Sequence, residues 1–244
     1  MEDLYDLLDS NETPFADAPK SGGSSSETKE QKKARRESLF DAKEIKPEKI
    51  TVDKFDTTGK YFSFMWYVEA AFLPDDETVA KFVKIAKYLF SKGFTYRAIY
   101  DSRNTLNNKI AELEGAKIEY YTPWKFKGID ESLPVKRYNP SSLAYGIACN
   151  NHRIFMKLAN GLRARLAAEV HSILGDDCLH PLSFIISYSA SGDEGLTKNI
   201  DFKAIKTMTF AYRIAGESNI PIYNIKNEGA LERIMNKVKI ITGE

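Results

Sequence analysis

Two hydrophobic periods alternate along residues 50–244 of the chain. Short runs rich in aromatic and β-branched residues predict strands over 61–68, 94–99, 117–121, 182–188 and 220–225. Apolar residues spaced three and four apart predict helices over 76–90, 104–114, 141–149, 154–171, 206–217 and 228–238. Strands that alternate with helices favour an α/β fold, with a mostly parallel sheet covered by helices on both faces.

The first residues lack this periodicity, and we expect residues 1–45 to form a disordered acidic tail and charged linker before one α/β domain at 46–244. Gly and Ser residues over 21–26 predict a flexible connection, and a basic cluster follows at 29–36. Apolar side chains interrupt the acidic residues of 1–20, which is typical of a short peptide that docks on a protein partner. The residues expected to bind this partner are Leu4, Tyr5, Leu7, Leu8 and Phe15. The alternative is an ordinary disordered terminus.

The charge of the chain is unevenly distributed. The net charge is +1, and residues 1–20 hold six acidic side chains against one lysine, so the remainder carries about +6. An acidic tail on a basic body is a polarity that single-strand nucleic-acid binders use, and scattered surface charge is the alternative. Two cysteines do not predict a disulfide framework, and we expect neither a secretion signal nor a membrane-spanning run. The expected location is the cytoplasm.

The order of elements and several short motifs resemble the SLOG superfamily, the Rossmann-like group that includes DprA and the LOG-type proteins. The resemblance covers about residues 60–226. Within the superfamily, the chain resembles the phage-encoded DprA-like members. The resemblance depends on the segments at 92–97, 123–125, 175–186, 212–215 and 220–224. It implies a Rossmann-like fold, and it raises the expectation of single-stranded DNA binding because DprA binds such DNA on this scaffold.

The chain departs from this family where a nucleotide would bind. Family members carry glycines and an acid in the first loop, whereas this sequence has Ile99, Tyr100, Arg103 and Thr105. A second glycine-rich run is replaced by residues 206–209. Since glycine lets the backbone approach a phosphate closely, these changes argue against nucleotide hydrolysis of the LOG kind. We therefore expect no enzyme activity, no catalytic residues and no cofactor.

Cations and aromatic residues follow the predicted strands, where the loops of a parallel sheet converge on one edge. Single-strand binding uses cations along the phosphates and flat rings on which bases stack. The predicted nucleic-acid-binding residues are Arg97, Tyr100, Arg103, Trp124, Lys125, Phe126, Lys127, Lys136, Arg137, Lys198, Lys203 and Lys206. The alternative is that Trp124 and Phe126 fill the core and that the lysines only solubilise the surface.

Metal and nucleophile chemistry are less well supported by the pattern. Cys149, His152, His171, Cys178 and His180 fall in one region, but their spacing is not that of a zinc finger, and no metal is predicted. A Cys–His nucleophilic pair lacks a recognisable local context. Acidic residues at 176–177 and 193–194 are expected to belong to turns and to face solvent.

The sequence thus predicts a non-enzymatic single-stranded DNA-binding protein. A phage accessory factor in transcription, replication or recombination fits the resemblance, with a partner such as an RNA polymerase recruited through the tail, in the host cytoplasm. One concrete version holds a melted promoter for a phage polymerase. The first alternative is a SLOG protein that binds or processes a nucleotide. The second is a structural interaction protein with an inactive pocket. The oligomeric state stays open, a homo-oligomer included.

Overall fold

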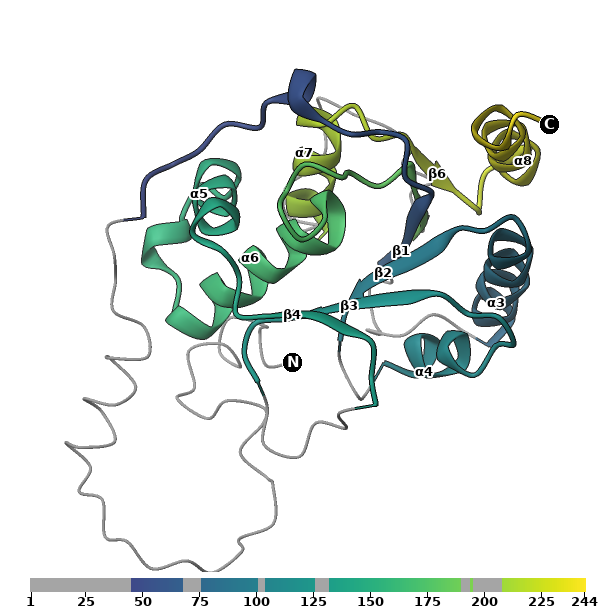
Figure 1. Cartoon of the computed structure of the whole chain (residues 1–244), viewed down its shortest axis with the longest axis horizontal. Helices are drawn as coiled ribbons and strands as arrows, with labels where there is room; N and C mark the ends of the chain where they lie inside the picture. The colour runs from purple at the N-terminus through teal and green to yellow at the C-terminus, as the bar shows by residue number, and fades with distance from the viewer. Residues whose placement is uncertain (1–44, 68–75, 101–103, 126–131, 190–193, 195–207) are drawn as a thin grey trace, which may run out of the picture. The chain divides into compact units, whose positions relative to one another are not determined.

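Six strands form one sheet in the computed structural model of this chain, in the order β4-β3-β2-β1-β5-β6 (Figure 1). The structure describes residues 45–67, 76–100, 104–125, 132–189, 194 and 208–244. The pairings between these neighbours are parallel, which confirms the predicted α/β class as a Rossmann-like arrangement. The strands are β1 (Tyr61–Tyr67), β2 (Thr95–Ile99), β3 (Ile118–Thr122), β4 (Val135–Tyr138), β5 (Phe184–Ser189) and β6 (Ile222–Asn224).

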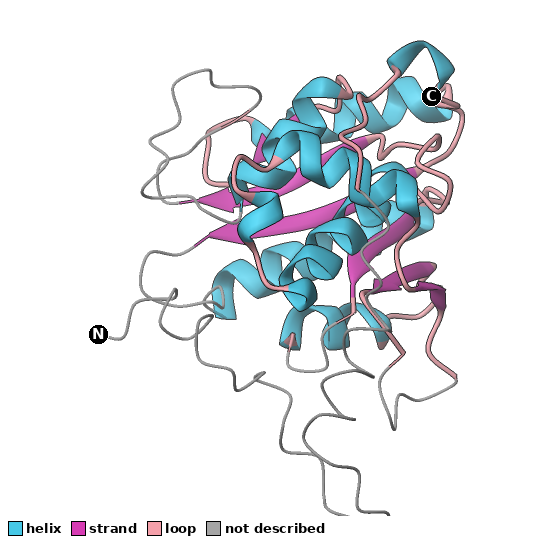
Figure 2. Ribbon diagram, turned by 90° about the vertical axis from the view of Figure 1, so that its left-hand side faces the viewer, coloured by secondary structure: helices cyan, strands magenta, loops and turns pink. Residues whose placement is uncertain are grey.

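Helices cover both faces of the sheet, as Figures 1 and 2 show. One face carries α5 (Ser142–Asn151), α6 (Asn160–Leu174) and α7 (Met208–Glu217). The other carries α3 (Asp76–Ser91), α4 (Thr105–Ala111) and α8 (Ala230–Thr242). Short 3-10 turns, η1 (Val52–Lys54) and η2 (Phe155–Lys157), precede β1 and α6. None of the helices in the described part of the chain has the length and apolar character needed to cross a bilayer.

Alternation along the strands divides the core into two layers. On β1, Phe62 and Phe64 pack with α3 and α8, whereas Tyr61 and Met65 face the helices on the opposite side. On β5, the side chains that point to either face of the sheet are buried, because the strand lies between β1 and β6 and helices cover both faces. The mostly apolar run predicted as a strand at 182–188 is therefore an inner strand of the sheet, β5, which begins at Phe184.

The strand order reverses direction once, between β1 and β5. The chain builds β2, β3 and β4 outward on one side of β1 and then returns to place β5 and β6 on the other side. In open parallel sheets, ligands bind at the carboxyl ends of the strands, most often at such a reversal. The fold therefore identifies two places to examine, the carboxyl ends of β2 to β4 and those of β1, β5 and β6.

The predicted set of elements needs two corrections. The pattern did not predict β4, a four-residue edge strand that contains two charged residues. The helix predicted over 154–171 begins only at Asn160, because the preceding residues form η2. In that turn Phe155 is buried in the core beside α5 and α6, while Met156 is 57% exposed. The described residues belong to one compact unit, Lys43–Glu244, and the predicted tail lies outside them.

Candidate nucleic-acid interface

Six of the predicted nucleic-acid-binding residues lie in the described part of the chain, and they occupy different environments. Two are engaged in internal contacts, one is partly in the core, and three belong to the carboxyl end of β3 and to β4. Arg103, Phe126, Lys127, Lys198, Lys203 and Lys206 lie outside the described residues, as do Leu4, Tyr5, Leu7, Leu8 and Phe15.

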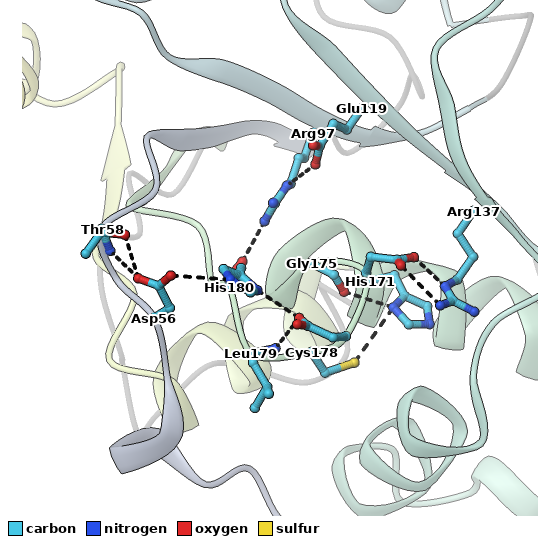
Figure 3. A network of polar contacts seen from close by, with 12 residues as sticks. Asp56, Thr58, Arg97, Glu119, Arg137, His171, Gly175, Cys178, Leu179 and His180 are labelled. Carbon is cyan, nitrogen blue, oxygen red and sulfur yellow. Dashed lines mark hydrogen bonds and ion pairs between the residues drawn. The ribbon is translucent and has the colours of Figure 1, made fainter.

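Arg97 is a correction to the predicted interface, because it lies within β2 and is only 3% exposed. Its Nε donates to Glu119 Oε2 at 2.6 Å, and its Nη1 donates to the carbonyl oxygen of His180 at 2.6 Å. The guanidinium carbon lies 3.3 Å from the centroid of the Tyr61 ring. The predicted place of Arg97 in an open loop is wrong, since the side chain is enclosed between the sheet and the α6 layer (Figure 3).

Arg137 is also engaged within the protein. Its Nε and Nη2 donate to the two carboxylate oxygens of Asp176, at 2.5 and 3.2 Å. This forked ion pair joins β4 to the turn between α6 and β5, and its hydrogen bonds raise the pKa of Arg137. The guanidinium face suited to phosphate is bound to a carboxylate, so a phosphate would have to compete with Asp176, and phosphate binding by Arg137 stays a prediction.

Tyr100 continues the ladder beyond β2 and is half-buried. Its backbone N–H donates to the carbonyl oxygen of Tyr121 at 3.0 Å, and its ring centroid lies 5.4 Å from that of Tyr120 in an edge-to-face contact. The ring thus packs partly into the layer beneath α4. The side chain of Asn104 caps α4 by accepting from the backbone N–H of Asn107.

The three remaining predicted residues and Tyr138, the last residue of β4, form what we name the Trp124 surface, which comprises Trp124, Lys125, Lys136 and Tyr138. Trp124 follows β3 and is half-buried, and its ring lies beside Gly161 at the start of α6. Lys125 is exposed, with its Nζ 5.9 Å from the centroid of the Tyr138 ring. Lys136 is exposed within β4, at the irregularity in the β3–β4 register, and Tyr138 is the last residue of that strand. Two aromatic rings and the ammonium group of Lys125 therefore meet at the carboxyl ends of β3 and β4.

A polar network between β2 and the turn that follows α6 contains His171, Cys178 and His180 (Figure 3). His171 of α6 is buried, and its ring stacks on Tyr121 with centroids 5.9 Å apart. The backbone N–H of Ser141 donates to its Nε2 at 3.0 Å, so this nitrogen carries no hydrogen. Nδ1 lies 2.9 Å from the carbonyl oxygen of Gly175 and donates to it. These two contacts fix a neutral imidazole in one tautomer.

Cys178 lies next to this histidine, with its Sγ 3.7 Å from Nδ1 of His171. Burial raises the pKa of the Cys178 thiol to about 12, which disfavours the thiolate that a nucleophile requires. His180 instead lies between two carboxylates, with Nδ1 2.9 Å from Asp177 and Nε2 3.3 Å from Asp56. Within the described ranges, no group of three or more His, Cys, Asp or Glu side chains is placed to hold a metal ion.

The neutral state of His171 predicts a pH-dependent stability. Burial lowers the pKa of His171 below 6.5, and it lowers that of His152, whose buried Nδ1 has no hydrogen-bond partner within the described residues. The unfolded chain therefore binds protons to these two side chains more readily, so both lower the free energy of unfolding as the pH drops through 6.5, whereas the Glu169 carboxyl, whose pKa burial raises to about 7, acts in the opposite direction. The slope cannot exceed about 1.4 kcal/mol per pH unit for each histidine, and it disappears below the folded-state pKa of that histidine.

Urea denaturation at several pH values between 7.5 and 5.5 measures this slope. His171→Gln should remove its share of the pH dependence, in addition to any loss of stability that does not vary with pH. His152→Gln should remove the other share. A pH slope that is the same in the unaltered chain and in both variants would contradict the assignment.

A second polar group, which the sequence pattern did not reveal, lies at the carboxyl ends of β5 and β6. Asn224 is fully buried, and its Nδ2 donates to Ser189 Oγ at 2.8 Å. Its backbone N–H donates to Glu194 at 2.8 Å, and Glu194 pairs with Arg233 of α8 at 2.6 and 2.7 Å. Although burial opposes it, the bonds from Arg233, Asn227 and Asn224 lower the pKa of Glu194. Glu194 thus joins β6 to α8, whereas the pattern indicated a solvent-facing acid.

Comparison of the chain with protein-family models, with curated proteins and with solved structures gives no match.

Proposed function

We propose that this chain is a non-enzymatic single-stranded DNA-binding protein and that the Trp124 surface is its DNA site. The observation that carries the proposal is the position of Lys125 over the Tyr138 ring, beside Trp124, where β3 and β4 end. Aromatic rings at such an edge provide faces for bases, and ammonium groups neutralise the phosphates that pass them. Since every base has a flat face, this arrangement favours binding with little sequence preference.

Two further observations support the proposal. Of the charge of about +6 beyond the first 20 residues, about +5 belongs to residues 46–244, and a net positive charge on the folded part favours a polyanion. The SLOG resemblance includes DprA, which binds single-stranded DNA, although fold alone does not determine function. We propose in addition that residues 1–20 recruit a protein partner such as an RNA polymerase, and that the chain acts as a phage accessory factor in the host cytoplasm.

Binding of a small nucleotide is the second candidate, and one observation favours it. Ser187, Ser189 and Asn224 are all at most 1% exposed and lie near the carboxyl ends of strands beside the reversal between β1 and β5. This is where doubly wound sheets hold nucleotides. The hydroxyl of Tyr212 donates to Ser187 Oγ at 3.2 Å, so part of this polar group is engaged within the protein.

A fluorescence anisotropy titration of the full chain with a labelled single-stranded oligonucleotide tests the DNA site. Trp124→Ala should weaken binding by about 1–3 kcal/mol, which is roughly 5- to 150-fold, because it removes a stacking face. Trp124→Phe should retain most of the affinity. Lys125→Gln should reduce the dependence of log affinity on log salt by about 0.7, the value for one phosphate contact on a single strand.

Lys84→Gln is the matched control for the lost charge, since Lys84 is exposed on α3, on the opposite face of the sheet. It should leave the salt slope unchanged. Competition by an unlabelled mononucleotide separates the two candidates, because a nucleotide held at the β1–β5 reversal would not displace the oligonucleotide from the Trp124 surface. If the oligonucleotide does not bind even at low salt, the proposal fails and a structural interaction protein is the better description.

A further inference from the structure

Helix α8 exposes more apolar surface than any other element in the described part of the chain. Among the described residues, seven large hydrophobic side chains are exposed, and three of them are on this 13-residue helix. Leu231 at 52% and Met235 at 42% lie about 40° apart around the helix, and Ile240 at 76% lies on a different side of it. Exposed apolar residues that gather on one element indicate a contact surface more often than singly scattered ones do.

The helix is anchored on its other side, so the exposed face is already formed. Ala230, Ile234 and Val238 are buried, and the last two pack with the residues of α3 and β1. At its end, Lys92 binds the side chain of Glu244, with Nζ 2.5 Å from Oε2. α8 lies next to β6, the strand at the end of the sheet (Figure 1). A partner can therefore approach without rearranging the fold.

The charges beside the apolar residues are arranged symmetrically about the middle of the helix. Glu232 lies three residues before Met235 and Lys239 lies four residues after it, so both flank Met235 on the same side of the helix. Both side chains are exposed. Leu231 flanks Met235 on the other side, next to the buried face. One exposed stripe of α8 therefore has an apolar centre with an acid at one end and a base at the other.

This pattern is complementary to itself in one orientation. When two copies of α8 pack antiparallel about a two-fold axis near Met235, Glu232 of each copy faces Lys239 of the other. A parallel pair would place like charges together. We propose that a second copy of this chain docks on this face through antiparallel contact of the two α8 helices. Such an interface is isologous, since each residue makes the same contact twice.

The contact area of one helix pair is small, which sets the expected strength. Stable interfaces bury about 1,200–2,000 Å² in total, and a pair of short helices lies at or below the lower end of this range. The dimer should therefore be weak and should depend on concentration. Because the interface lies on α8 rather than on the Trp124 surface, the inference does not depend on DNA binding.

Sedimentation velocity of the full chain over a concentration series tests the dimer. We expect the average mass to rise from monomer towards dimer, and Met235→Ser to weaken association about tenfold. Ile240→Ser is the matched control, because Ile240 is more exposed but lies about 140° around the helix from Met235. It should leave association unchanged. A partner of any other kind would leave the chain monomeric at every concentration, which would overturn the proposal.

Charge reversal tests the register. Glu232→Lys and Lys239→Glu should each weaken self-association about tenfold, because each brings like charges together twice. The double variant should restore association, and an equimolar mixture of the two single variants should form a mixed dimer. Lys84→Glu on α3 controls for the change in net charge. If neither the double variant nor the mixture recovers association, the antiparallel arrangement is wrong.

Discussion

Replacing Arg97 with alanine should lower the free energy of unfolding by about 3–5 kcal/mol, because the substitution removes one partner of a buried ion pair. Glu119 would lose its donor at 2.6 Å, and the carbonyl oxygen of His180 would lose the other. The Tyr61 ring would lose the cation that covers it. Chemical denaturation at pH 7 measures this loss, and urea is preferable to guanidinium because it does not screen ion pairs.

The loss of unfolding free energy should depend on which buried charge the substitution leaves without a partner. Replacing both partners, as in Arg97→Met with Glu119→Gln, should recover much of the stability, since no buried charge is left alone. Arg97→Lys should be intermediate because an ammonium cannot donate in two fixed directions. Arg153→Ala is the matched control, as Arg153 is exposed. An Arg97→Ala protein as stable as this control would show that the buried ion pair contributes little.

Arg97 also illustrates which part of the fold could be predicted from the sequence. Its neighbours Tyr96 and Ala98 pack in the α3 layer, so alternation alone places Arg97 on the opposite face of a buried strand. Alternation does not identify the residues that Arg97 binds. Glu119 is 22 residues away and His180 is 83 residues away, and only the assembled sheet and α6 bring them together.

The elements that were predicted well are those whose own pattern is strong. In α3, Val79, Phe82 and Ala86 recur at helical spacing, and the acidic first turn defines its start. β4 was missed because its four residues include Lys136 and Arg137. Its place as a strand depends on pairing with β3 and on the Arg137–Asp176 ion pair, which links residues 39 apart.

The candidate site was predictable to a similar extent. The position of Trp124 and Lys125 after a strand was enough to place them at the carboxyl edge, because this follows from the parallel sheet alone. The sequence did not show that Lys125 would lie over Tyr138, since this contact requires β4 to pair beside β3. The group around Asn224 had no sequence signal, because its members come from β5, β6, α8 and the residue at 194.

The second large effect is expected at Gly175, where α6 ends. The backbone there has φ of +87° and ψ of 179°, a conformation that is almost confined to glycine. A methyl group at Gly175 would lie 2.9 Å from the carbonyl oxygen of His180 and 3.2 Å from Nη1 of Arg97. Gly175→Ala should therefore lower the free energy of unfolding by about 3 kcal/mol or more, from backbone strain and overpacking together.

Gly93→Ala separates these two causes. Gly93 also has a positive φ, of +81°, but a methyl group there would meet nothing within 4 Å. Its loss should be about 1–2 kcal/mol, from strain alone. The difference between the two variants, measured by urea denaturation, combines the backbone strain peculiar to Gly175 with the cost of crowding the His180 carbonyl oxygen and the buried arginine. In the Arg97→Ala background this difference should shrink, because the guanidinium is gone. Equal losses at both glycines would show that the turn yields to a methyl group and that Gly175 is not needed to make room for Arg97.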